Sequence, residues 1–205
     1  MAYDTSILGF MKESELQVLE QLASTVPDNG VIVEIGSCFG RSSVCWAKSA
    51  PQATVYCVDT FSDQDWVCEA QYSNDYDIVH GCPRTGEIYN TKKEFIKNTK
   101  DIPNIIMIAG NSPHVEYNGN EIDLFFLDAL HMNPNDWENL CHWIPLCKPN
   151  AIICGHDMVD DFPDVQNNVR LLEKLLNKNV TLYPNGTVWS FKLERVISKS
   201  ELLNI

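Results

Sequence analysis

Residues 31–43 read VIVEIGSCFGRSS, and this stretch decides the fold class because it joins a buried strand to a loop of small residues. The first five residues lack polar alternation, which is typical of a strand that is covered on both faces. The loop carries Gly36 and Gly40, and the next segment, residues 41–50, has the composition of a helix. A strand, a glycine loop and a helix in this order predict a parallel sheet in which a ligand can approach bare backbone.

The rest of the chain alternates between helical and strand patterns. Apolar spacing predicts helices over 13–26, about 87–99, 135–143 and 165–178, and strands over 53–59, 104–110, 122–128 and 151–157. Residues 180–193 place Asn-Gly between two alternating runs, which is a strong hairpin signal. The sequence therefore predicts a doubly wound α/β fold, with a mostly parallel sheet, helices on both faces and an antiparallel hairpin at the end.

The length of 205 residues predicts a single domain, residues 1–205. Residues 60–86 break the alternation, because they are acidic, aromatic and irregular. A connection of this length without a regular pattern is uncommon unless it is functional, so we expect a lid-like insertion over the substrate. Its rings, Trp66, Tyr72 and Tyr76, could stack on an aromatic ring or a sugar; the alternative is a short helix that packs them on the domain.

Composition limits the classes of partner. A formal net charge of −13 argues against a protein whose main task is to bind a phosphate backbone, so nucleic acid is an unlikely partner. No secretion signal or membrane-spanning apolar run is present, which predicts a cytoplasmic protein without membrane contact. The eight cysteines form no CxxC pair, and we interpret them as core thiols in preference to a zinc cluster or disulfide framework.

The polar residues of interest directly follow the predicted strands. In a parallel sheet of this kind, ligands bind outside the carboxyl ends of the strands. The residues at these ends are Gly36–Gly40, Asp59, Gly110–Ser112, Asp128–His131, and His156 with Asp157. We therefore expect one site that is assembled from all of these segments.

The glycine loop indicates which ligand binds there. A dinucleotide needs glycine at the middle position of the loop so that its pyrophosphate can approach, but Cys38 stands there and Arg41 replaces the third glycine. NAD is therefore disfavoured. Asp59 lies 23 residues after Gly36, where a carboxylate for ribose hydroxyls is expected. S-adenosylmethionine is a nucleoside ligand without phosphates that satisfies both conditions.

These segments resemble the class I S-adenosylmethionine-dependent methyltransferases, and among them the small O-methyltransferases of the catechol and macrocin types. The matching pieces are VEIGSCFGRSS, VYCVDTF, MIAGNSP, IDLFFLDALH, WIPLCKPNAIICGHD and the closing hairpin, and they span roughly residues 30–193. The resemblance implies a Rossmann-like, seven-stranded sheet in the order 3-2-1-4-5-7-6.

The resemblance also implies cofactor contacts. The methionine moiety would lie in a pocket shaped by Glu34, Gly36, Ser37 and Gly40, with Ser42 beside its carboxylate. Asp59 would hold the ribose hydroxyls. The adenine would lie beside Asn111 and Ser112.

Two routes to deprotonation of an oxygen nucleophile stay open. Catechol-type relatives hold Mg²⁺, and Asp128 and Asp157 match two of their ligands, but Met158 stands at the third position and cannot bind a hard cation. His156 precedes Asp157 and would suit a softer divalent metal. His131 lies where these relatives place a catalytic lysine, so it is the candidate general base.

The leading prediction is therefore an S-adenosylmethionine-dependent methyltransferase, a transferase that acts on a small hydroxylated acceptor such as a sugar or phenol, with or without a divalent metal. A binding module that keeps the nucleoside but has lost the chemistry is the first alternative. A nicotinamide-dependent oxidoreductase is the second and is disfavoured by Cys38 and Arg41. Homo-oligomer formation stays open.

Overall fold

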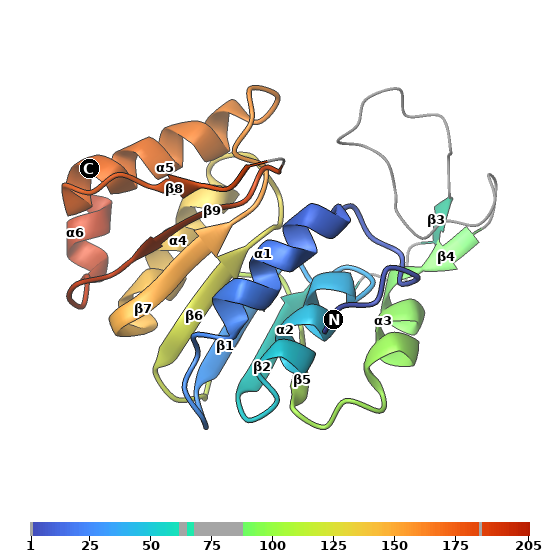
Figure 1. The fold of residues 1–205 in the computed structure, drawn as a ribbon. Helices are drawn as coiled ribbons and strands as arrows, with labels where there is room; N and C mark the ends of the chain where they lie inside the picture. Colours follow the sequence, from blue (N-terminus) through green and yellow to red (C-terminus); the bar gives the residue numbers. More distant parts are fainter. Residues whose placement is uncertain (1, 62–64, 68–87, 185) are drawn as a thin grey trace.

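The computed structural model describes residues 2–61, 65–67, 88–184 and 186–205. Its centre is a seven-stranded sheet in the order β5-β2-β1-β6-β7-β9-β8 (Figure 1). Neighbouring strands are parallel from β5 to β7, whereas β9 pairs antiparallel with β7 and with β8. The strands are β1 Val31–Ile35, β2 Thr54–Asp59, β5 Ile105–Ala109, β6 Ile122–Leu127, β7 Cys147–Gly155, β8 Thr181–Leu182 and β9 Trp189–Lys192. Counted by chain order within this sheet, the arrangement is 3-2-1-4-5-7-6, which confirms the predicted fold class.

Helices cover both faces of the sheet (Figure 1). Strand β1 shows the division, because Ile32 packs in one buried cluster with side chains of α1 and α2, while Val31 and Val33 pack in another with side chains of α4 and α5. Alternate residues of a strand point to opposite faces, so a strand that is apolar throughout contributes to both clusters. The helices are α1 Glu13–Ala23, α2 Arg41–Ser49, α3 Thr91–Thr99, α4 Asn135–Trp143, α5 Pro163–Leu176 and α6 Lys199–Leu203, with a 3₁₀ turn η1 at Ile144–Leu146.

One predicted helix begins later than expected. Residues 88–90 form a short strand, β4 Ile88–Asn90, which pairs antiparallel with β3 Asp65–Val67. The side chain of Asn90 accepts a hydrogen bond from the backbone N–H of Lys93 at 3.1 Å, so Asn90 caps α3 and fixes its start at Thr91. Residues 62–64 and 68–87 lie outside the described residues, and with them most of the predicted lid over 60–86, including Tyr72 and Tyr76.

Two smaller differences concern the start of β7 and the closing hairpin. Strand β7 begins at Cys147 and not at residue 151, and the closing hairpin has short strands around a connection that contains Asn185, a residue outside the described set.

Among the described cysteines, six are free thiols and five of these are buried. In the described part of the chain, no helix combines the length and apolar character needed to cross a membrane.

Candidate active site

A cavity of about 610 Å³ opens at the carboxyl ends of the parallel strands. Its walls come from the segments that follow β1, β2, β5, β6 and β7, as the sequence predicts, and also from residues 8–11 and Phe162. This volume lies in the range of about 300–1,000 Å³ that small-molecule sites occupy. The cavity therefore has room for a nucleoside-sized ligand.

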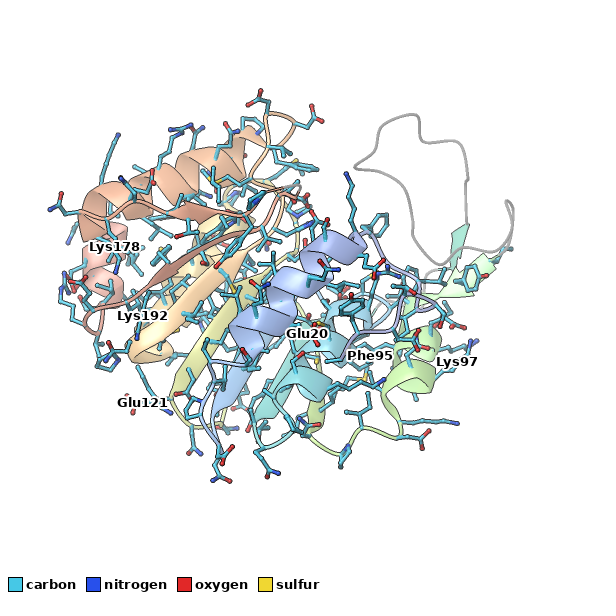
Figure 2. The ribbon with its side chains drawn as sticks, viewed as in Figure 1. Glu20, Phe95, Lys97, Glu121, Lys178 and Lys192 are labelled. Carbon is cyan, nitrogen blue, oxygen red and sulfur yellow. The ribbon has the colours of Figure 1, made fainter. Side chains whose placement is uncertain are left out.

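Gly36 is required by the close approach of two loops in this cavity. Its φ of +91° is one that side-chain-bearing residues rarely adopt, and a Cβ built there would lie 1.8 Å from the carbonyl oxygen of Asp128. Gly40 also has a positive φ and precedes α2; a Cβ there would lie 3.2 Å from Phe95 of α3, which Figure 2 labels. The loop is thus pressed between β6 and α3, and Gly40 supports it without lining the cavity.

Asp59 is held at the cavity wall by the glycine loop itself. Its Oδ2 accepts the backbone N–H of Cys38 at 2.9 Å, and its Oδ1 accepts the N–H of Phe61 at 3.0 Å. The side chain stays partly exposed and lines the cavity. A carboxylate fixed in this way can still accept hydrogen bonds from a pair of ligand hydroxyls.

Glu34 lies beneath the loop and does not line the cavity. It is fully buried and accepts hydrogen bonds from the hydroxyl of Ser43 and from the indole N–H of Trp46, the latter at 3.1 Å. Burial raises the pKa of the Glu34 carboxyl, and hydrogen bonds from nearby serines oppose this only in part. Glu34 therefore ties β1 to α2 under the loop, while Ser37 and Ser42 are among the residues that line the cavity.

Replacement of Glu34 with glutamine is expected to raise the melting temperature at about pH 7.5 by about 2–4 °C, the shift that roughly 1 kcal/mol gives in a chain of this length. A carboxyl whose pKa is raised on folding stabilises the fold below its ordinary pKa of 4.5, and this contribution is lost as the pH rises through the folded-state pKa. Glutamine stays neutral, so its advantage should shrink near pH 5. Thermal unfolding at both pH values tests this, with exposed Glu116→Gln as the control; a lower melting temperature for Glu34→Gln at pH 7.5 would contradict it.

The segment after β5 contributes one anchored and one exposed residue. The Ser112 hydroxyl is buried, donates to Asn139 and accepts the indole N–H of Trp143 at 2.8 Å. Asn111 is exposed and lines the cavity. Ser112 therefore fixes the wall, and the Asn111 side chain remains accessible from the cavity.

Arg41 fastens the N-terminal segment over the cavity, a role that sequence reasoning missed. Its guanidinium donates to the carbonyl oxygens of Thr5 and Ile7, at 3.0 and 2.5 Å. Gly9 allows this contact, because a Cβ there would lie 2.7 Å from Cδ of Arg41. Residues 8–11 then line the cavity together with Arg41. The arginine that stands in place of the third glycine thus holds the N-terminal segment against the cavity, which a glycine at this position could not do.

Four ionisable side chains converge at the edge of the cavity. His131 Nε2 lies 3.5 Å from Asp128 Oδ1 and 3.1 Å from Asp157 Oδ2. His156 Nδ1 lies 3.5 Å from Asp128 Oδ1 and 3.2 Å from Asp157 Oδ1. Asp157 has a φ of +57°, which costs free energy and is common at functional sites. Each aspartate therefore faces two imidazoles.

In this cluster, the aspartates and the histidines each favour the charged form of the other. Burial opposes ionisation of Asp128, yet the charges and hydrogen bonds of His156 and His131 outweigh it and hold the pKa of this carboxyl well below its usual range. Burial also disfavours the charged imidazoles, but the facing aspartates raise the pKa of His131 and raise that of His156 well above its ordinary value. At a pH above this raised pKa, the neutral ring of His131, the more exposed of the two histidines, can accept a proton from a bound hydroxyl.

The same cluster has a donor set that fits a divalent cation. Ligand atoms of Asp128, His131 and Asp157 all lie within 4.8 Å of one another. Carboxylates with an imidazole suit transition metals as well as harder cations. Met158 packs partly buried against the hydrophobic core and offers no oxygen. The sequence suggested His156 as the third metal-binding residue beside Asp128 and Asp157, whereas the structure groups His131 with the two aspartates.

Glu15 was missed as a site residue altogether. It belongs to α1, is 2% exposed and lies 3.1 Å from Nε2 of His156. The available signal was its place in the helix, since it precedes Leu19 by four and Leu22 by seven residues and so shares the buried face. An acidic residue on such a face requires a partner inside the protein.

Comparison with known proteins agrees with this architecture. A family model described as a methyltransferase domain matches residues 33–158, which is more than half of the chain. The chain therefore belongs to this methyltransferase family. A search of curated proteins found no match.

Several solved structures share the fold at low identity. A putative caffeoyl-CoA O-methyltransferase from Staphylococcus aureus has a TM-score of 0.62 and 14% identity, over 91% of this chain and 86% of that one. A putative O-methyltransferase from Klebsiella pneumoniae gives 0.57 and 15%, over 90% and 81%. The O-methyltransferase TomG from Streptomyces achromogenes, solved in complex with SAM, gives 0.58 and 17%, over 90% and 81%. At these identities the likeness shows the fold alone.

Proposed function

We propose that this methyltransferase transfers the methyl group of S-adenosylmethionine to an oxygen of a small hydroxylated acceptor. The observation that carries the proposal is the position of the Asp128, His131 and Asp157 cluster, which lines the same cavity as the glycine loop and Asp59. A cofactor site and a proton-accepting group that share one cavity are what methyl transfer to a hydroxyl requires.

The cofactor contacts divide along the cavity wall. The methionine end lies against the loop at Gly36 and Ser37, with the Ser42 hydroxyl beside its carboxylate. Asp59 accepts hydrogen bonds from the ribose hydroxyls. The exposed side chain of Asn111 lies beside the adenine, on the wall that Ser112 anchors. Glu34 and Gly40 act from beneath by fixing the loop.

The chain's own residues prepare the acceptor. His131 removes the proton of the acceptor hydroxyl, and Asp128 and Asp157 stabilise the imidazolium that results. The ring of Phe162 packs on His131 with centroids 4.4 Å apart and holds its orientation. A divalent cation held by Asp128, His131 and Asp157 would lower the pKa of a bound hydroxyl.

Titration calorimetry with S-adenosylhomocysteine against NAD tests the cofactor assignment. Binding of the first without the second supports the proposal, and the reverse would revive the nicotinamide alternative. A methyl-transfer screen over hydroxylated acceptors, with and without divalent cations, then separates an enzyme from a non-catalytic binding module. The acceptor class is the part of the proposal that this screen identifies.

Asp59→Ala is expected to weaken S-adenosylhomocysteine binding by at least about tenfold, because it removes a charged acceptor from two ribose hydroxyls. Calorimetric dissociation constants measure the change. The matched control is Asp101→Ala, which removes an exposed aspartate in the turn after α3. Equal affinity in the Asp59 variant and the wild type would rule out the ribose assignment.

Arg41→Ala is expected to weaken S-adenosylhomocysteine binding by about tenfold for a different reason. Without the two hydrogen bonds to Thr5 and Ile7, residues 8–11 close the cavity for a smaller fraction of the time. Lys48→Ala, an exposed change on the same helix, is the control. Proteolysis near the N-terminus should also speed up in the Arg41 variant alone, and unchanged affinity with unchanged proteolysis would contradict this role.

A further inference from the structure

Glu15 lies outside the cavity lining, but both of its carboxylate oxygens are engaged. Oε2 accepts the backbone N–H of Lys12 at 2.8 Å, which forms part of the cap of α1. Oε1 accepts the backbone N–H of Thr187 at 2.9 Å and lies 3.1 Å from Nε2 of His156. Gly186 leaves room for this side chain, because a Cβ there would lie 2.7 Å from Cγ of Glu15. Helix capping explains one oxygen only, and the other is directed at the active-site cluster.

Two connections lead from Glu15 into the cluster. The first runs through the His156 ring, whose opposite nitrogen, Nδ1, faces Asp128 and Asp157 at 3.5 and 3.2 Å. The second runs through Thr187, whose hydroxyl lies 3.3 Å from Glu15 Oε1 and accepts the backbone N–H of Asp157 at 3.0 Å. An imidazole that is paired with a carboxylate at one nitrogen presents the other in a preferred direction. Glu15 thus restrains both the ring and the strained backbone at Asp157.

We propose that Glu15 is a positioning residue for methyl transfer. It holds His156 and Asp157 in place and thereby fixes the two aspartates that face His131. The inference rests on the proposed function, in which His131 acts on the acceptor. Because Glu15 does not line the cavity, and its partners Lys12, Thr187 and His156 lie outside the glycine loop, its loss should leave cofactor affinity intact and disturb the cluster.

Three variants separate this role from a merely structural one. Glu15→Met removes both acceptors. Glu15→Gln keeps the shape of the side chain but replaces one of its two acceptor oxygens with an NH2 group. That group must face either the N–H of Lys12 or the donors of Thr187 and His156, so one of these contacts is lost. Thr187→Val removes only the hydroxyl that joins Glu15 to Asp157. The matched control is Asp123→Asn, because Asp123 also accepts a backbone N–H and pairs with a cation, Lys148, but at the amino end of β6.

The first readout needs no acceptor. In the wild type, ¹⁵N-edited NMR of the imidazoles should show a slowly exchanging proton on Nε2 of His156. In Glu15→Met that proton should exchange rapidly, and the ring-nitrogen signals of His131 should shift as well, since both rings face the same two aspartates. Thr187→Val should shift the His131 signals less, and Asp123→Asn should leave both rings unchanged. Affinity for S-adenosylhomocysteine should stay within about twofold in all variants.

The second readout is the rate. With an acceptor from the methyl-transfer screen, kcat of Glu15→Met should fall by about 10–100-fold, as is typical when a metal-ligating histidine loses its carboxylate partner, with little change in KM. If Glu15→Met does not fold, Glu15→Gln and Thr187→Val carry the test by the same signals. Wild-type ring signals and kcat in folded variants would overturn the inference. A wild type that does not bind S-adenosylhomocysteine would overturn the proposed function instead.

Discussion

Gly36→Ala is expected to lower the affinity for S-adenosylhomocysteine by at least about 100-fold. The alanine Cβ would lie 1.8 Å from the carbonyl oxygen and 2.5 Å from the carbonyl carbon of Asp128. Both atoms belong to the backbone, so no side-chain rotation relieves the contact. The φ of +91° adds a further cost, since a left-handed conformation disfavours residues with a Cβ by about 1–2 kcal/mol.

The loops after β1 and β6 must therefore move apart, and the cavity wall moves with them. They are also joined by a hydrogen bond from the N–H of Asp128 to the carbonyl of Ile35 at 2.9 Å, so the displacement reaches the cluster of Asp128, His131, His156 and Asp157. Calorimetry measures the loss of affinity for S-adenosylhomocysteine, and thermal unfolding measures the loss of stability. Gly119→Ala is the control, because the nearest atoms that its Cβ would meet belong to the side chain of Tyr117 and not to backbone. Wild-type affinity in Gly36→Ala would refute the close packing of the two loops.

The sheet could be predicted because its strands carry their signal locally. VIVEI and IDLFFL are apolar along their length, and a strand covered on both faces requires this. Strand β4 could not be predicted in the same way, because its three residues form a strand only by pairing with β3. Helix α6, with five residues, is also too short for a periodic pattern to show.

The site divides along similar lines. Asp59, Asp128, His131 and Asp157 lie at the carboxyl ends of strands or within four residues of them, so the topology alone brings them to one edge of the sheet. Glu15 reaches the cluster through a contact with Thr187, 172 residues later in the chain, and no local pattern encodes a contact of that separation. Arg41 illustrates the opposite case. Its position in the glycine loop was noticed, but its bonds to Thr5 and Ile7 depend on how the N-terminal segment packs.

His131→Ala is expected to reduce the rate of methyl transfer by about 10²–10⁴-fold, the contribution typical of a positioned acid or base, while cofactor affinity changes little. Initial rates with an acceptor from the screen measure the change. His114→Ala, an exposed histidine in the loop after β5, is the control. A variant with the wild-type rate would remove His131 from the mechanism.

A chelator must accompany this variant, because His131 belongs both to the proposed base and to the group of residues that fits a cation. Loss of the rate in His131→Ala is therefore expected under either chemistry. Two aspartates in one cleft repel each other unless positive charge lies between them, and both a divalent ion and the two facing imidazoles can supply it. If a cation is the source, EDTA and Asp128→Ala or Asp157→Ala should lower the rate alike, and added metal should restore the EDTA-treated wild type. If the imidazoles are the source, the rate should persist in EDTA and fall with His131→Ala, which assigns the proton transfer to His131 and the orientation of the acceptor to the aspartates.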